Sequence, residues 1–421
     1  MEFFNFDKRL LKNAEIAENM CKDAFARIDE ITDYNMQKVL NAFIECRVSD
    51  SHFKGTTGYG YSDMGRDKLE EVFAKSFGGE DALVRHSFAS GTHTIATVLY
   101  GILRPNDKAV CVTGTPYDTL HEVVWGKGKG SLEDFGIDFS VVDLDNDGNI
   151  DITNAEKAVF DKNVKMIYFQ RSRGYSLRPS FSVEYLAEVI ELLKKANPDA
   201  CIVVDNCYGE FCERLEPVQA GADIIVGSLI KNPGGGIAKN GGYIVGRADL
   251  IEQCAYRLTT PSTGKEVGAS LNELREMFLG LFNAPMAVCG ALKTAVFASA
   301  LFESFGYKAY PRYNESRADI INAIELGGEK ELIAFCRGIQ AGSPIDSFAY
   351  PEPWEMPGYD SKVIMAAGAF TMGASIELSA DAPLREPFAV WLQGGLNYPS
   401  GKVGILKAAQ TMSDEGLLKL D

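Results

Sequence analysis

The stretch ADIIVGSLIKNPGGGIAKNGGYIVG, residues 222–246, contains two short apolar runs that flank a lysine and three glycines. Runs such as DIIVGSL and GGYIVG are too short for a stable helix and are typical of buried strands. Lys231 comes directly after the first run, where a strongly hydrated side chain is unexpected. The fold around Lys231 therefore decides what this lysine can do.

Short apolar runs alternate with helical patterns from residue 67 to about residue 246. The runs include DALVRHSF, KAVCVTG, FSVVDL, KMIYFQ and CIVVDN, and the helical patterns include THTIATVLYGIL and SVEYLAEVIELLKKA. Such alternation indicates a mainly parallel sheet with helices on both faces. The sequence thus predicts an α/β fold, followed by a smaller α+β segment that contains KVIMAAGAF and ASIELSAD.

The length of 421 residues exceeds what one hydrophobic core usually holds, so more than one domain is expected. Residues 1–50 have apolar positions at three- and four-residue steps, which predicts an N-terminal helical arm. A glycine-rich aromatic turn region, KGTTGYGYSDMG, follows. We expect a large domain over residues 51–285 and a small C-terminal domain over residues 286–421.

Charge and composition argue against several classes of partner. A net charge of -16, from 42 basic and 58 acidic residues, repels nucleic acids and anionic membrane surfaces. The most apolar segment, residues 284–302, carries Lys293 at its centre and is interpreted as a buried helix. The N-terminal sequence does not resemble a signal peptide, so a cytoplasmic location is expected. Nine scattered cysteines and four histidines show no metal-site spacing, so no metal is expected.

Three predicted loops at the carboxyl edge of the sheet carry reactive or binding groups. Ligands of such sheets bind at this edge. Asp205 ends one strand and Lys231 follows the next, so a carboxylate and an amine could converge on one small molecule, with a buried ion pair as the alternative. Ser90 and Gly91 lead into a helix at Thr92, where free N–H groups favour a phosphate. An ordinary helix cap is the alternative there.

A phosphate site, a strand-end carboxylate and a strand-end lysine, in this chain order, are what a pyridoxal phosphate enzyme needs. A partly desolvated lysine can lose its proton and form a Schiff base with the cofactor aldehyde. The carboxylate keeps the pyridine nitrogen protonated, so that the ring can accept electrons. Tyr117, in VTGTPYDTLHEVV, follows another strand and is placed to stack on the ring, although local packing would also explain it.

The same motifs resemble those of a known family. The segments GYGYSDMGRDKLEEVFAKSFGGEDALVRHSFASGTHTI, GTPYDTL, VDNCYGEF and GSLIKNPGGG are similar to fold-type I pyridoxal phosphate enzymes of cysteine and methionine metabolism. Within them, the similarity is greatest to the methionine gamma-lyase-like group known as aluminium-resistance proteins. Two C-terminal segments, PEPWEMPGYDSKVIMAAGAF and ASIELSADAPLREPFAVWLQGGLNY, extend the resemblance over nearly the whole chain.

The resemblance implies a role for each motif residue. Lys231 would bind pyridoxal 5'-phosphate and then remove the alpha proton of the substrate, Asp205 would hold the pyridinium, and Tyr117 would stack on the ring. The complete set of expected cofactor contacts within one subunit comprises Ser90, Gly91, Thr92, Tyr117, Asp205, Tyr208, Ser228 and Lys231. Three of these, Lys231, Tyr117 and Asp205, are the expected catalytic residues.

The resemblance also implies contacts between subunits. Tyr59 or Tyr61 would reach the phosphate of a neighbouring subunit, which implies a homo-oligomer, a dimer or a tetramer, with shared active sites. Arg385, after SADAPL, would bind the carboxylate of a small amino-acid substrate. The chain departs from the family at Asp63, where an arginine is usual after the YS dipeptide, and Arg66 is the candidate substitute.

The segment QRSRGYSLRPS, after the run KMIYFQ, has no close counterpart in the ordinary lyases. Its arginines, Arg171, Arg173 and Arg178, could bind a second acidic group of the substrate, and Arg171 and Arg173 are the expected contacts. A solvated turn is the alternative interpretation. The chain also has Ile230 before the lysine, where the family usually has a hydroxyl residue.

The predicted reaction is an elimination. A pyridoxal phosphate-dependent carbon–sulfur lyase would act on a cystathionine, methionine or cysteine type of substrate by beta- or gamma-elimination, releasing a thiol, a keto acid and ammonia. An aminotransferase is the first alternative, because DNCYGEF also resembles a motif of those enzymes. A non-catalytic pyridoxal phosphate-binding regulatory protein is the second alternative.

Overall fold

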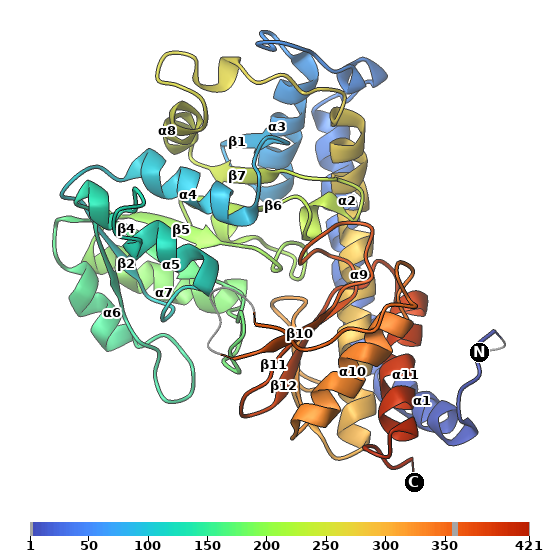
Figure 1. Cartoon of the computed structure of the whole chain (residues 1–421). Helices are drawn as coiled ribbons and strands as arrows, with labels where there is room; N and C mark the ends of the chain where they lie inside the picture. The colour runs from blue at the N-terminus through green and yellow to red at the C-terminus, as the bar shows by residue number, and fades with distance from the viewer. Residues whose placement is uncertain (1–2, 356–360, 421) are drawn as a thin grey trace. The chain divides into compact units, whose positions relative to one another are not determined.

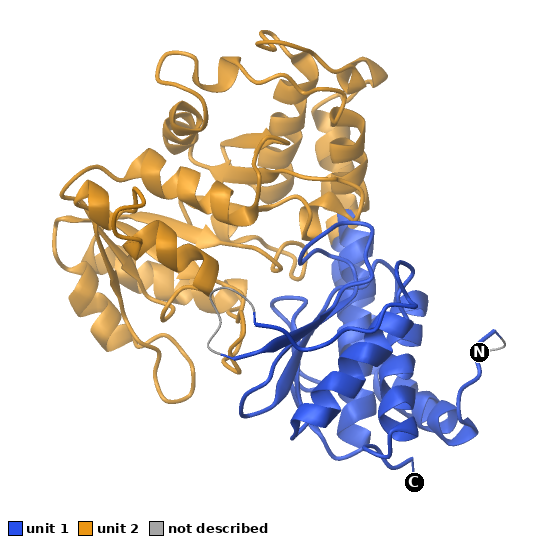
Figure 2. Ribbon diagram, viewed as in Figure 1, with its two compact units in different colours: residues 1–34, 284–421 blue, residues 35–283 orange. Residues whose placement is uncertain are grey.

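A computed structural model of the chain describes residues 3–355 and 361–420 (Figure 1). It forms two compact units: unit 2 is residues 35–283, and unit 1 is residues 1–34 together with 284–421 (Figure 2). The limits of the units fall within two helices, α2 (Lys22–Glu45) and α9 (Leu274–Ser304). The domain limits inferred from the sequence stay a prediction. Residues 356–360 of the PEPWEMPGYD motif lie outside the described residues.

Unit 2 is built on a seven-stranded sheet in the order β1-β7-β6-β5-β4-β2-β3. The strands β2, β3, β4, β5 and β6 run parallel, whereas β7 is antiparallel to both of its neighbours. Their bounds are β1 Asp81–Arg85, β2 Lys108–Cys111, β3 Asp138–Val141, β4 Val164–Gln170, β5 Cys201–Asp205, β6 Ile224–Ser228 and β7 Gly242–Gly246. The predicted α/β class, with a mainly parallel sheet, is confirmed.

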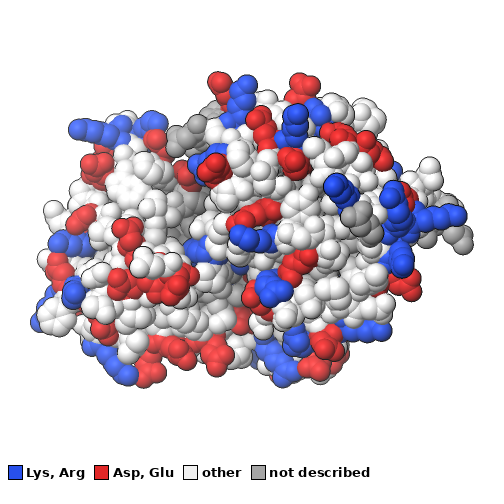
Figure 3. All heavy atoms as spheres, turned by 90° about the horizontal axis from the view of Figure 1, so that it is seen from below, with Lys and Arg blue, Asp and Glu red and all other residues white. Residues whose placement is uncertain are grey.

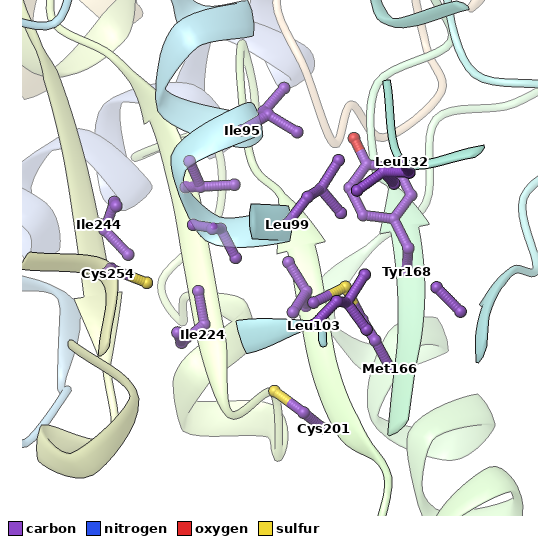
Figure 4. Packing of buried hydrophobic residues seen from close by; sticks show 14 of the residues in the cluster. Ile95, Leu99, Leu103, Leu132, Met166, Tyr168, Cys201, Ile224, Ile244 and Cys254 are labelled. Atoms are coloured by element: carbon purple, nitrogen blue, oxygen red, sulfur yellow. The ribbon is translucent and has the colours of Figure 1, made fainter. Parts of the chain in front are cut away.

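Helices cover both faces of this sheet. The helices of unit 2 between α2 and α9 are α3 Met64–Phe77, α4 Gly91–Ile102, α5 Asp118–Trp125, α6 Ile152–Val159, α7 Val183–Ala196 and α8 Ala248–Leu258. On one face α4, α5 and α8 bury a hydrophobic cluster that includes Ile95, Leu99, Met166 and Ile244 (Figure 4). Alternate strand residues point to the opposite face, where Phe77 of α3 stacks on Tyr243.

Unit 1 contains a five-stranded antiparallel sheet in the order β10-β11-β12-β9-β8. Its strands are β8 Lys308–Tyr310, β9 Asn322–Glu325, β10 Val363–Ala366, β11 Ser379–Pro383 and β12 Ala389–Gln393. Its helices α10 (Glu329–Ala341) and α11 (Tyr398–Asp414) pack together, and α10 lies on β10 and β11. The helix α1 (Lys8–Met20) packs on α11. This is the small α+β segment that the sequence predicts.

Three further features bear on the predictions made from composition: the apolar helix α9, the cysteines and the surface charge. Within the described residues, α9 is the one helix long and apolar enough to cross a membrane, but 89% of its most apolar window is buried, as in a core helix. All nine cysteines are buried and free, and the described residues contain no cluster of metal ligands. On the face drawn in Figure 3, basic and acidic side chains are interspersed over most of the surface.

Candidate active site

The parallel strands β4, β5 and β6 of unit 2 end at the same edge of the sheet, and polar residues stand at their ends. Gln170 ends β4, Asp205 ends β5 and Ser228 ends β6, and these three strands are parallel neighbours. β1 pairs with β7, which is antiparallel to β6, so the loop after β1 also opens at this edge. The topology therefore brings together the loops that the sequence analysis selected.

The start of α4 forms a cradle for an anion. Ser90 is the N-cap, and its Oγ accepts a hydrogen bond from the backbone N–H of His93 at 3.1 Å. The backbone N–H groups of Gly91 and Thr92 have no acceptor within the described part of the chain. A Cβ at Gly91 would lie 3.5 Å from the Cβ of Ser228, which places this cradle beside the end of β6. The N–H groups and the helix dipole together favour a phosphate.

Tyr117 is the N-cap residue of α5 and is half-buried. Its backbone N–H donates to Oε1 of Gln170 at 3.1 Å, which fixes Tyr117 to the end of β4. Burial raises the pKa of the Tyr117 phenol well above its ordinary value, and the carboxyl of Asp205 acts in the same direction. Tyr117 is therefore a neutral phenol at the carboxyl edge. Sequence reasoning missed Gln170, although its position as the last residue of the run KMIYFQ was a usable signal.

Asp205 is almost fully buried at the end of β5. Its Oδ1 accepts a hydrogen bond from the backbone N–H of Cys207 at 3.1 Å. Burial raises the pKa of Asp205, and the hydrogen bonds from Cys207 and the charge of Lys231 offset only part of this effect. A cation placed against this carboxyl would reverse the balance and favour the ionised form.

Lys231 is half-buried and precedes a single 3-10 turn, η4 (Asn232–Gly234). Its Nζ lies 3.5 Å from the centroid of the Tyr208 ring. Burial disfavours the ammonium form, but Tyr208, Cys207 and Asp205 outweigh burial, so the pKa of Lys231 lies above its ordinary value. Lys231 thus stays at the carboxyl edge because an aromatic face and a buried carboxyl group stabilise its charge.

The glycines after Lys231 allow the chain to turn sharply behind it. A Cβ at Gly234 would lie 1.7 Å from the carbonyl oxygen of Leu229, so no other residue fits there without moving the backbone. Gly235 and Gly236 have positive φ angles, which glycine adopts without strain. The backbone N–H of Gly234 donates to the carbonyl of Lys231 at 3.3 Å. The glycine run therefore fixes the backbone that carries the lysine.

Tyr59 and Tyr61 are exposed, at 74% and 60%, on a loop that is bound to residues 268–271. The N–H of Gly268 donates to the carbonyl of Tyr59 at 2.9 Å, and the two tyrosine rings lie 5.7 Å apart. Nη1 of Arg66 donates to the carbonyls of Gly60 and Gly268, at 2.9 Å and 3.1 Å. The buried Arg66 guanidinium therefore anchors the loop from within, and these contacts weigh against the predicted use of Arg66 at a phosphate.

Asp63, the departure from the family pattern, is the N-cap of α3. Its carboxylate accepts hydrogen bonds from the N–H of Arg66 at 3.0 Å and from the hydroxyls of Ser270, at 2.6 Å, and Thr56. Burial opposes ionisation of Asp63, but the hydroxyls of Ser270 and Thr56 outweigh it, so its pKa lies below the ordinary value. Asp63 therefore holds the tyrosine loop on α3.

The three arginines after β4 are all buried, so the alternative of a solvated turn is wrong. Arg171 donates to the amide oxygen of Asn206 at 2.7 Å and to the carbonyl of Gly209 at 2.9 Å, and it forms an ion pair with Glu213. These contacts favour a structural role for Arg171, and its assignment to the substrate stays a prediction.

The other two arginines differ in their contacts. Arg178 donates to the carbonyls of Gln170 and Pro179, at 3.0 Å and 2.8 Å, so it shapes the turn itself. Nε of Arg173 donates to Oγ of Ser180 at 3.3 Å. Arg385 lies in unit 1, exposed between β11 and β12. The predicted substrate contacts of Arg173 and Arg385 stay predictions.

The chain is similar to known proteins over almost its whole length. The methionine gamma-lyase family model matches residues 10–413. A solved structure of a candidate cystathionine beta-lyase involved in aluminium resistance, from Listeria monocytogenes, is 48% identical with a TM-score of 0.94, covering 95% of this chain and 99% of its own. A carbon–sulfur lyase involved in aluminium resistance from Clostridium novyi is 46% identical, with a TM-score of 0.93, covering 97% and 96%. An uncharacterised Bacillus subtilis protein, YnbB, is 48% identical over 395 residues, which are 93% of this chain and 94% of that protein.

Proposed function

Because this chain belongs to the methionine gamma-lyase family, a family of pyridoxal phosphate-dependent enzymes, we propose that it is a carbon–sulfur lyase that uses pyridoxal 5'-phosphate. The observation that carries the proposal is the convergence of Lys231, Asp205 and the start of α4 at one edge of a mainly parallel sheet. The similarity to a carbon–sulfur lyase at 46% identity supports the reaction class.

The side chains at this edge fit the cofactor. The N–H groups of Gly91 and Thr92, which have no acceptor among the described residues, would hold the phosphate together with the Ser228 hydroxyl. The carboxylate of Asp205 would pair with the pyridinium, and Lys231 would bind the aldehyde carbon. Further contacts would come from Ser90, Tyr117 and Tyr208.

Each catalytic side chain has a defined task in an elimination. Pyridoxal phosphate, when bound, supplies an electrophilic carbon for amines and a ring that takes up an electron pair from the substrate. Nζ of Lys231 is protonated in the cofactor-free protein and would have to lose this proton before it accepts the proton from the alpha carbon of the amino acid. Tyr117, which its raised pKa keeps as a neutral phenol, would stack on the ring, and the proton taken up by Lys231 would be passed to the leaving thiolate. Addition of water then gives a keto acid and ammonia.

The substrate class is a sulfur-containing amino acid of the cystathionine, methionine or cysteine type. Its alpha carboxylate would bind to Arg385, and a second acidic group, where present, would bind to Arg173. Arg171 is the weaker candidate because its guanidinium already binds Asn206, Gly209 and Glu213. Beta- and gamma-elimination both use this set of residues.

We further propose a homo-oligomer, a dimer or a tetramer, with active sites shared between subunits. Tyr59 and Tyr61 are exposed, yet their loop is firmly held by Arg66 and Asp63. An exposed aromatic pair on a well-anchored loop suits a contact with a second copy of the chain. In that contact a tyrosine hydroxyl would donate to the phosphate of the neighbouring site.

An aminotransferase is the second candidate, because Tyr208 lies directly over Lys231 and both reactions use the same cofactor contacts. Product analysis separates the two reactions. The protein is incubated with pyridoxal phosphate and with L-cystathionine, L-cysteine or L-methionine, and thiol, keto acid and ammonia are measured. Equal amounts of the three products from one substrate support the lyase. Keto acid formed without thiol, and only in the presence of a second keto acid, would instead identify an aminotransferase.

A further inference from the structure

Glu210, in the loop after β5, is fully buried behind the carboxyl edge of the sheet. Its Oε1 accepts a hydrogen bond from the hydroxyl of Tyr243, on β7, at 2.8 Å. Its backbone carbonyl accepts a hydrogen bond from Nδ2 of Asn232 at 2.9 Å, and Asn232 directly follows Lys231. Glu210 therefore connects β7 to the loop that carries Lys231. Its partner on β7, Tyr243, lies 33 residues further along the chain.

The surroundings of Glu210 disfavour a negative charge. The titratable groups that face it are Asp205, Cys207 and Glu216 along the chain and Tyr243 from β7. Among the described residues no lysine or arginine pairs with it, since the nearby Arg171 faces Glu213 and Glu216 instead. A carboxylate here would be desolvated beside two other acidic groups. Accordingly, burial raises the pKa of Glu210 to about 8, although a backbone N–H and the Tyr243 hydroxyl partly offset the effect.

Two buried oxygen atoms, one on Glu210 and one on Asn232, could accept a further hydrogen bond. Oε2 of Glu210 and Oδ1 of Asn232 both lack a hydrogen-bond donor within the described residues. A carboxylate oxygen and an amide oxygen are both acceptors, but a protonated carboxyl has an O–H to donate. Protonation of Oε2 thus supplies a donor to a region where Asn232 contributes an unsatisfied acceptor. An unsatisfied buried polar group is costly, so the neutral acid is the form that fits the loop.

Packing leaves the Glu210 carboxyl little freedom. A Cβ at Gly227, on β6, would lie 2.7 Å from Oε1 of Glu210 and 2.8 Å from the hydroxyl of Tyr243. The ring of Tyr243 packs in turn against Phe73 and Phe77 of α3. β6 therefore passes directly against the Glu210–Tyr243 pair, and any change in the volume or charge of this pair reaches the strand that leads to Lys231.

We propose that Glu210 is a positioning residue for Lys231 that works as a neutral, protonated acid, held by Tyr243 and acting through Asn232. The proposal deepens the proposed function and rests on it for the role of Lys231. The proposal has a structural half and a functional half. The structural half states that uncharged Glu210 orders residues 229–236 in the cofactor-free protein, and it can be tested independently of the proposed function.

The structural half is tested on cofactor-free protein. In infrared difference spectra between the wild type and Glu210→Gln, we expect a protonated carboxyl band at pH 7 that disappears through about pH 8. Hydrogen exchange read by mass spectrometry should show residues 229–236 protected in the wild type and in Glu210→Gln, and exchanging at least about tenfold faster in Glu210→Ala. Should Glu210→Ala not fold, Tyr243→Phe, which keeps the ring, takes its place with a smaller increase. Absence of the band at pH 7, or equal exchange in all variants, overturns the proposal.

The functional half is tested on protein loaded with pyridoxal phosphate. Glu210→Gln should keep kcat and KM near the wild-type values at pH 7, because it preserves shape and neutrality. In the wild type, ionisation of Glu210 should lower kcat as the pH rises. This part of the decline should be absent in Glu210→Gln. Glu210→Ala should lower kcat about tenfold or more with little change in KM, as expected for a misplaced lysine. An unchanged kcat in Glu210→Ala overturns the positioning role. A wild-type protein that binds no cofactor would instead refute the proposed function and leave the exchange and infrared results to decide the structural half.

Discussion

Replacing Glu210 by glutamine should stabilise the cofactor-free protein increasingly as the pH rises. The folded protein keeps Glu210 protonated up to about pH 8, whereas the unfolded chain ionises the same group near its ordinary pKa of 4.5. Between these values folding takes up a proton. The stability that this group contributes is therefore complete below pH 4.5 and is lost as the pH rises through 8. Glutamine does not titrate, so Glu210→Gln escapes the loss.

The size of the effect follows from the difference between the two pKa values. Each pH unit in this window changes the free energy of unfolding by about 1.4 kcal/mol for one proton. From pH 5 to pH 8 the wild type should thus lose about 4 kcal/mol relative to Glu210→Gln. Because Glu210 is fully buried, solvent screening does not reduce this figure.

Urea unfolding of cofactor-free protein, followed by far-ultraviolet circular dichroism at several pH values, measures this difference directly. Titratable groups remote from Glu210 titrate alike in both proteins, so their contributions cancel in the comparison. A difference that stays constant to within about 1 kcal/mol between pH 5 and pH 8 would show that folding does not raise the pKa of Glu210. The matched control is Glu216→Gln, which replaces a buried acceptor of hydrogen bonds from Phe211 and Asn206 and should destabilise the protein instead.

Substitutions at three further positions test the lysine loop, the buried arginine and the helix cap. Gly234→Ala places a methyl group 1.7 Å from the Leu229 carbonyl oxygen and should lower stability by roughly 3 kcal/mol, measured by urea unfolding. Arg171→Met leaves the buried carboxylate of Glu216 without its ion-pair partner and should lower the free energy of unfolding by roughly 3–5 kcal/mol; unchanged stability with a raised KM would instead support a substrate contact. Ser90→Ala should cost about 1 kcal/mol through loss of the helix cap, while Ser90→Gly should cost only a few tenths, as seen in thermal unfolding of cofactor-free protein.

The fold class and the sheet edge that carries the site were accessible from the sequence because they depend on local patterns. Apolar runs of five to seven residues, such as CIVVD in β5, alternate with amphipathic helices, and this alternation dictates a mainly parallel sheet. The direction of β7 was not accessible, because GGYIVG is equally apolar in either orientation. Its antiparallel placement depends on pairing with both β1 and β6.

Side-chain contacts between residues far apart in the chain could not be predicted from the sequence. The identity of Arg66 does not reveal that its guanidinium binds the carbonyls of Gly60 and Gly268. Arg171 stands in a polar, glycine-containing segment typical of a solvated turn, yet it is completely buried. The contact between Glu210 and Tyr243 joins the loop after β5 to β7, which is not the next strand along the chain. These details arise only when the sheet forms and its loops compete for the same donors.

The central claim, that Lys231 binds pyridoxal phosphate, is tested most directly by absorption spectra of purified protein with the cofactor added. We expect a visible band of lysine-bound cofactor in the wild type and its loss in Lys231→Ala. Lys239→Ala is the matched control, since Lys239 is an exposed lysine in the same loop region that pairs with Glu276 on the surface, and it should keep the band. A band of equal strength in Lys231→Ala, or no band in the wild type after pyridoxal phosphate is added, would contradict the account.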